Sequence, residues 1–66
     1  MKGLADNLKK RRVMLGLTQK DMELQGNIPP GTMSNLEKGY RVPTLKNLKK
    51  ISTVLGVTID SLLTEN

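Results

Sequence analysis

The sequence predicts an all-α protein built from five short helices. Apolar residues recur at three- and four-residue steps, which is the spacing of a helix with one buried face. Capping and turn-forming residues separate each apolar stretch from the next. No stretch shows the apolar–polar alternation typical of a strand. We therefore expect residues 1–66 to form a single helical domain.

The first helix is expected to carry Leu4, Leu8 and Leu15 on one face and to end at Gly16 in a left-handed conformation. The second begins after Thr18, whose hydroxyl can accept the backbone N–H of Asp21. Residues 26–27, Gly-Asn, then allow a sharp turn, because both residue types tolerate positive φ.

The third helix is expected to begin near Pro30, because proline suits the first helical turn, and to end at Gly39. Thr44 would cap the fourth helix, Gly56 would end it, and Thr58 would cap the fifth. The apolar faces expected to form the core in these helices comprise Met33, Leu36, Leu45, Leu48, Ile51, Val54, Leu55, Ile59, Leu62 and Leu63.

Composition excludes several kinds of site. The chain has no cysteine and no histidine, so it lacks disulfides, thiolate metal sites and the commonest general base. We expect no enzyme, no metal and no other cofactor. No apolar run approaches the ~20 residues of a membrane span, and the N-terminus is too polar for a signal peptide, so a cytoplasmic protein is expected. The net charge of +5 favours an anionic partner.

Helices two and three, joined by a tight turn over residues 18–38, have the pattern of a helix-turn-helix, whose second helix enters the DNA major groove. Four segments of the sequence have a recognisable pattern. They lie at residues 16–19 (GLTQ), 32–39 (TMSNLEKG), 43–45 (PTL) and 55–63 (LGVTIDSLL). At this spacing they resemble the XRE family, the lambda-repressor-like family that includes phage Cro proteins. The resemblance covers nearly the whole chain and implies a five-helix lambda-repressor-like domain.

The resemblance also implies site residues. The positions matching base-contacting residues are Pro30, Gly31, Thr32, Ser34 and Asn35. Those matching phosphate-contacting residues are Gln19, Lys38, Tyr40 and Arg41. Lys46 and Lys49 could equally contact phosphates or serve only as solubilising charges. An asparagine can select adenine through paired hydrogen bonds, although Asn35 could also be an ordinary exposed residue. Arg12 and Glu37 match a structural ion pair between the first and third helices.

Three departures from the family pattern stand out. Glu23 replaces a usual alanine, and Gly26 replaces a core aliphatic, so Leu24 is expected to supply the missing packing. Pro30 and Gly31 replace polar base-reading residues, either for close backbone approach to DNA or as a tight turn. Specificity is then expected to depend on Thr32, Ser34, Asn35 and DNA shape.

These features predict a sequence-specific regulator of transcription, by default a repressor, that binds double-stranded DNA at a short palindromic operator as a homodimer. The candidate dimer residues are Val57, Ile59, Leu62 and Leu63, although Ile59 and Leu62 could belong to the monomer core. An antitoxin or partner-controlled regulator is the alternative. RNA binding is disfavoured because Tyr40 is the only aromatic residue. No small-molecule ligand is expected.

Overall fold

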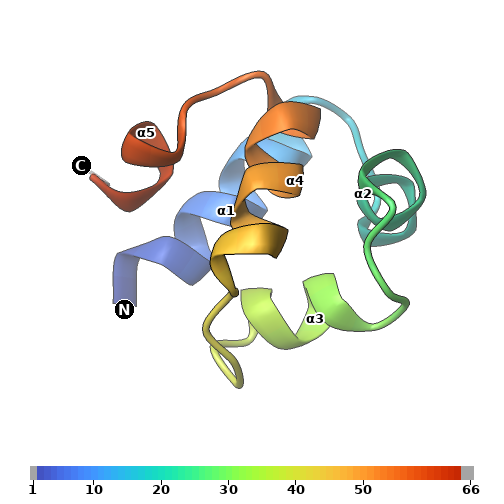
Figure 1. Ribbon diagram of the computed structural model, residues 1–66, viewed down its shortest axis with the longest axis horizontal. Helices are drawn as coiled ribbons and strands as arrows, with labels where there is room; N and C mark the ends of the chain where they lie inside the picture. Colours follow the sequence, from blue (N-terminus) through green and yellow to red (C-terminus); the bar gives the residue numbers. More distant parts are fainter. Residues whose placement is uncertain (1, 65–66) are drawn as a thin grey trace.

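The structure is a computed structural model that describes residues 2–64, and this stretch contains five helices and no strand (Figure 1). The helices are α1 (Lys2–Met14), α2 (Gln19–Gly26), α3 (Thr32–Glu37), α4 (Leu45–Leu55) and α5 (Ile59–Leu63). The predicted all-α class and the order of the five helices are confirmed.

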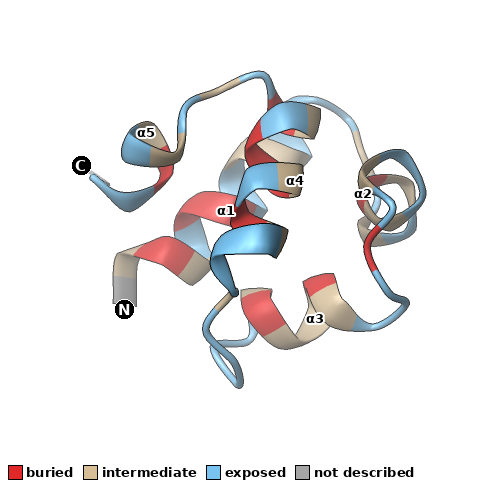
Figure 2. Ribbon diagram, in the orientation of Figure 1, coloured by how far each residue is buried: buried red, intermediate tan, exposed pale blue. Residues whose placement is uncertain are grey.

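The helix α4 lies at the centre of Figure 1 in front of α1, and it packs against α2 and α5. α2 packs against α4 and α3, and α1 packs against both α3 and α5. α3 is therefore supported by two helices, whereas its outer side is free of other elements (Figure 1). Buried segments of all five helices turn towards the common centre, and exposed segments turn outwards (Figure 2).

The core consists of aliphatic side chains and methionines. Its buried members are Leu4, Leu8, Met22, Ile28, Met33, Leu36, Leu48, Ile51, Leu55 and Leu62. Tyr40, the single aromatic residue of the sequence, lies outside the core and is 72% exposed. Each fully buried aliphatic side chain contributes about 1.5–3 kcal/mol, so a small core of this kind depends on nearly every member.

Threonine caps define where three helices begin. The side-chain oxygen of each threonine accepts the backbone N–H three residues on, as predicted, with donor–acceptor distances of 2.9 Å for Thr18, 3.1 Å for Thr44 and 3.0 Å for Thr58. Asp21 completes a capping box by accepting the Thr18 backbone N–H at 2.9 Å. This hydrogen bond lowers the pKa of Asp21.

Three residues expected in the apolar faces lie outside the core, namely Leu15, Leu45 and Leu63, the last of which is 39% exposed at the end of α5. Leu15 is 53% exposed because α1 ends at Met14, one residue earlier. Leu45 is 68% exposed because it is the first residue of α4, beyond the end of the neighbouring core. For Leu15 and Leu45 the apolar spacing continues past the part of the helix that other elements cover.

The prediction that α3 starts near Pro30 is wrong, because the helix begins at Thr32. The carbonyl of Pro29 accepts the backbone N–H of Thr32 at 3.2 Å, and Gly31 has φ 86° and ψ −11°. These are the features of a type II turn with proline and glycine at its two central positions. The Pro-Gly pair therefore forms a tight turn ahead of the helix.

The expected compensation by Leu24 is also wrong, because this side chain is 71% exposed. The space beside Gly26 is filled instead by Ile28 and Val54. A Cβ built on Gly26 would lie 2.9 Å from Cδ1 of Ile28 and 3.2 Å from Cγ2 of Val54. Neighbouring side chains have taken the volume that an aliphatic residue would occupy at this position.

This close packing makes the effect of Gly26→Ala depend on Ile28. We expect Gly26→Ala alone to lower the free energy of unfolding, because the new methyl group displaces the Ile28 side chain. With Ile28→Val also present, which removes Cδ1, the same change should be better tolerated by about 1 kcal/mol or more, because the overpacking is relieved. Urea unfolding of the double-mutant cycle measures the coupling, and additivity of the two changes would contradict it.

Candidate nucleic-acid interface

The turn between α2 and α3 sets the position of α3. Asn27 adopts the left-handed conformation (φ 52°) that ends α2. The next residue, Ile28, is buried and donates its backbone N–H to the carbonyl of Glu23 at 2.8 Å. From α4, the ammonium of Lys50 donates to the carbonyl of Asn27 at 3.0 Å. The turn is thus bonded to α2 and to α4.

Glu23 caps α3 from the neighbouring helix. The N-cap residue of α3 is Gly31, which has no side chain to accept the free N–H groups of the first turn. Oε2 of Glu23 accepts the backbone N–H of Met33 at 3.0 Å instead. A carboxylate at this end also suits the positive end of the helix dipole. The departures from the family pattern at residues 23 and 31 therefore compensate each other.

Arg12 and Glu37 form the ion pair that the resemblance implies. Nε and Nη2 of Arg12 donate to the two carboxylate oxygens of Glu37 at 2.7 and 3.1 Å. Nη1 donates to the carbonyl of Leu17 at 2.6 Å. The two side chains are 11% and 3% exposed. The hydrogen bond to Glu37 raises the pKa of Arg12 above its ordinary value.

Gln19 also contacts this ion pair. Its Nε2 donates to Oε1 of Glu37 at 3.0 Å, and its side chain is half-buried. The first residue of α2 is thereby bonded to the last residue of α3. This contact holds the side-chain amide of Gln19, which was predicted to contact a DNA phosphate, between α2 and α3.

The outer face of α3 is polar and accessible. Thr32, Ser34 and Asn35 are half-buried on the helix, whereas Pro30 and Gly31 are exposed in the turn before it. A shallow hollow adjoins this face. It is lined by Pro30, Gly31, Thr32, Asn35, Leu36, Arg41, Val42, Pro43, Thr44 and Asn47. Most of the predicted base-contacting residues therefore share one surface with Arg41.

The loop that follows α3 is tied back to the helix. The carbonyl of Asn35 accepts the backbone N–H groups of Tyr40 at 2.9 Å and Arg41 at 3.4 Å. The ammonium of Lys38 lies 5.7 Å from the centre of the Tyr40 ring, in the range of a cation–π contact. The exposed side chains of Lys38, Tyr40 and Arg41 are thus held beside the C-terminal end of α3.

The predicted dimer residues differ in how much surface they offer. Leu62 is fully buried in the core, so its assignment to a dimer interface is corrected: it has no surface left for a partner chain. Val57 and Ile59 are partly buried against the same core, and Leu63 is 39% exposed. Within the described part of the chain, only these three of the four predicted residues offer any surface to a second copy.

Residues 2–64 contain neither a metal-ligating cluster nor a membrane-spanning helix. This stretch contains no group of three or more metal-ligating residues of the types Asp, Glu, Cys and His. None of its helices is both long and apolar enough to cross a membrane.

The cap supplied by Glu23 predicts a specific loss of stability. Glu23→Ala should lower the free energy of unfolding by about 0.5–2 kcal/mol, as for loss of a side-chain cap, and speed hydrogen exchange at the Met33 amide. Gln25→Ala is the matched control, because Gln25 is exposed on the same helix and should change stability by less than about 0.5 kcal/mol. Equal effects from the two variants would contradict the capping role.

Removing one partner of the Arg12–Glu37 pair strands the other charge in a nearly closed site. Arg12→Met should lower the free energy of unfolding by about 3–5 kcal/mol. The double variant Arg12→Met with Glu37→Met should lose less than the two single variants added together, because neither charge is then left unpaired. Urea unfolding in a stabilising osmolyte keeps the weakest variant folded enough to measure. A loss below about 1 kcal/mol would mean that the pair behaves as a surface pair.

Comparison with known proteins agrees with this geometry. Residues 8–62 match the family described as helix-turn-helix. The chain is 38% identical over 60 residues to the HTH-type transcriptional regulator ImmR of Bacillus subtilis (strain 168). This match covers 91% of the chain but 47% of the relative, so the chain spans about half of that protein's length. No solved structure matches the chain. The family match over most of the chain confirms the resemblance found in its sequence, and the protein belongs to the XRE family of helix-turn-helix DNA-binding domains.

Proposed function

We propose that this protein binds double-stranded DNA sequence-specifically and represses transcription by occupying an operator. The observation that carries the proposal is the accessible polar face of α3, which two other helices and the Glu23 cap hold in a fixed orientation. A helix presented in this way fits the major groove. The relative described above is named a transcriptional regulator, which supports the same function.

Base contacts are assigned to Thr32, Ser34 and Asn35. The Asn35 amide can donate to and accept from one adenine, which discriminates against other bases by roughly 1–3 kcal/mol. The methyl group of Thr32 can pack on a thymine methyl. Because Pro30 and Gly31 form the turn before the helix, their proposed contribution is close approach of the backbone to the groove rather than side-chain readout.

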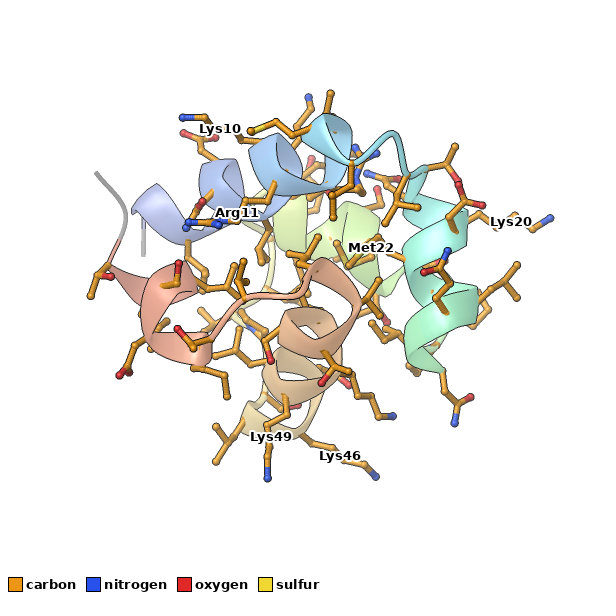
Figure 3. All side chains as sticks on the ribbon, turned by 90° about the horizontal axis from the view of Figure 1, so that it is seen from above. Lys10, Arg11, Lys20, Met22, Lys46 and Lys49 are labelled. Carbon is orange, nitrogen blue, oxygen red and sulfur yellow. The ribbon has the colours of Figure 1, made fainter. Side chains whose placement is uncertain are left out.

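Phosphate contacts are assigned to side chains at the two ends of this surface. Gln19 lies at the start of α2, and Lys38, Tyr40 and Arg41 follow α3. Lys46 and Lys49 project from α4 at the edge of the molecule opposite Lys10 (Figure 3). They are further candidates for phosphate contacts. Neutralised phosphates supply most of the affinity of such complexes and make it depend on salt.

The proposal includes a homodimer on a palindromic site. A single α3 of six residues can read only a few base pairs. Two copies paired through Val57, Ile59 and Leu63 would place their α3 helices on successive major grooves, about 34 Å apart. A cytoplasmic location and a promoter target are further parts of this proposal.

Selection of binding sites from a randomised duplex pool, followed by fluorescence anisotropy across a salt series, tests the function. We expect a two-fold symmetric sequence with half-sites about one helical turn apart. We also expect the affinity to fall steeply as salt rises. Weak binding with no enriched sequence would contradict the proposal and favour a role in binding a protein partner.

Variants then separate the two kinds of contact. Asn35→Ala should cost about 1–3 kcal/mol on the selected site and relax selection at one base position. Arg41→Ala should weaken binding to all sequences and reduce the salt slope by about one. Lys10→Ala is the matched control for charge, because Lys10 lines a different part of the surface that contains no residue of α3. An equal loss in Lys10→Ala would mean that only net charge matters.

A further inference from the structure

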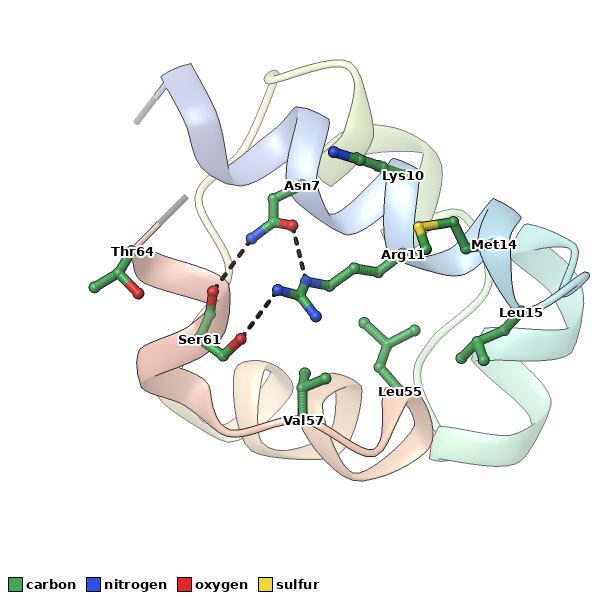
Figure 4. Close-up of a pocket in the computed structure, with 9 residues that line it drawn as sticks. All are labelled: Asn7, Lys10, Arg11, Met14, Leu15, Leu55, Val57, Ser61 and Thr64. Atoms are coloured by element: carbon green, nitrogen blue, oxygen red, sulfur yellow. Dashed lines mark hydrogen bonds between the residues drawn. The ribbon is translucent and has the colours of Figure 1, made fainter. Parts of the chain in front are cut away.

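A groove of about 570 Å³ lies between α1 and the C-terminal part of the chain (Figure 4). Its lining residues are Asn7, Lys10, Arg11, Met14, Leu15, Leu55, Val57, Ser61 and Thr64. None of them belongs to α2, α3 or the loop after α3. The volume falls within the range of about 300–1,000 Å³ found for small-molecule sites.

A buried asparagine fixes the charged group of this groove. Asn7 is 1% exposed, and its Nδ2 donates to the carbonyl of Leu62 at 2.9 Å. Its Oδ1 accepts from Nε of Arg11 at 2.9 Å, and Nη2 of Arg11 donates to Oγ of Ser61 at 3.0 Å. The guanidinium is therefore held between α1 and α5, and it carries more N–H groups than these bonds use (Figure 4).

The rest of the lining is mainly aliphatic. Met14 and Leu15 lie at one end, and Leu55 and Val57 form the wall that faces Arg11 (Figure 4). Met14 is 75% exposed and Leu15 is 53% exposed, although both are large apolar side chains. An occupant that covered them would gain hydrophobic free energy in proportion to the apolar area removed from water.

Charge selects the kind of occupant. Among the residues 2–64 that line the groove, two are cationic, Lys10 and Arg11, and none carries a carboxylate. An anionic group is therefore the chemical match for this lining. A matching ligand combines an anionic group, which a fixed guanidinium binds through two parallel hydrogen bonds, with an apolar body.

We propose that the α1–α5 groove binds a small amphipathic anion, namely a carboxylate with a short aliphatic chain. The carboxylate pairs with Arg11 and lies near Lys10, and the aliphatic chain covers the exposed side chains of Met14 and Leu15. Such a ligand bridges α1 and α5. The site is independent of the proposed DNA contacts, and it departs from the expectation that the chain has no small-molecule ligand.

Titration with octanoate, octan-1-ol and acetate, followed by ¹H–¹⁵N NMR of the full chain, tests the site. Octanoate should shift the Arg11 Nε–H signal and the Val57 and Ser61 amides saturably, with a dissociation constant of about a few millimolar for a ligand of this size. The neutral alcohol and the acetate, which lacks the chain, should each bind at least about tenfold more weakly. Equal binding of octanol, or no saturable shift with octanoate, would overturn the proposal.

Two neighbouring residues on α1 provide a matched pair of variants. Met14→Glu places a negative charge in the groove, whereas Val13→Glu places the same charge on an exposed residue outside its lining. Met14→Glu should weaken octanoate binding by about tenfold, and Val13→Glu by no more than about twofold. Both side chains are largely exposed, so both variants should fold. Equal weakening by the two would show that octanoate responds only to overall charge and would overturn the assignment of the site.

Discussion

The buried pair of Arg12 and Glu37 is the interaction on which the arrangement of the helices depends. It joins the last turn of α1 to the last residue of α3, and the same two side chains bond to the Leu17 carbonyl and the Gln19 amide. One site therefore connects α1, the following loop, α2 and α3. A buried charge pair contributes little net stability against an apolar pair of the same shape, but it strongly penalises any packing that separates its members. In a domain with so small a core, that penalty fixes the orientation in which α3 is presented.

A second constraint acts at the other end of α3. The type II turn requires Gly31 at a positive φ, which removes any side-chain cap from the helix that follows. Glu23 supplies the missing acceptor from α2, so its carboxylate occupies the space between the two helices of the motif. The tight turn at Gly31 therefore requires the Glu23 carboxylate, because the turn leaves the first N–H groups of α3 without a side-chain acceptor. The Glu23 carboxylate and the contact between Gln19 and Glu37 together bond α2 to α3 at both ends of the shorter helix.

The sequence predicted what depends on local rules. The five helices, their order and the threonine caps follow from spacing and side-chain chemistry within a few residues, and each is present. The sequence predictions failed where the burial of a side chain depends on residues far away in the sequence. Leu24 is exposed because Ile28 and Val54 already fill the space beside Gly26, and Leu62 is buried because α5 packs its one fully apolar side against the core. The role of Glu23 was missed, although a glycine at the N-cap of α3 signals that another residue must cap it. The base and phosphate contacts of the candidate interface remain predictions, because no spacing in the sequence specifies the DNA.

The adjacent residues Arg11 and Arg12 of α1 contact two different parts of the molecule. Successive helical residues point about 100° apart, so Arg11 and Arg12 reach different neighbours. Arg12 bonds to α3 and fixes the proposed DNA-reading helix, whereas Arg11 bonds to Ser61 of α5 and is presented in the groove. The helix on the far side of this groove, α5, also carries Ile59 and Leu63, two of the three residues proposed for dimerisation. Arg12 therefore sets how α3 is held within one copy, whereas Arg11 lies beside the segment that we propose joins two copies.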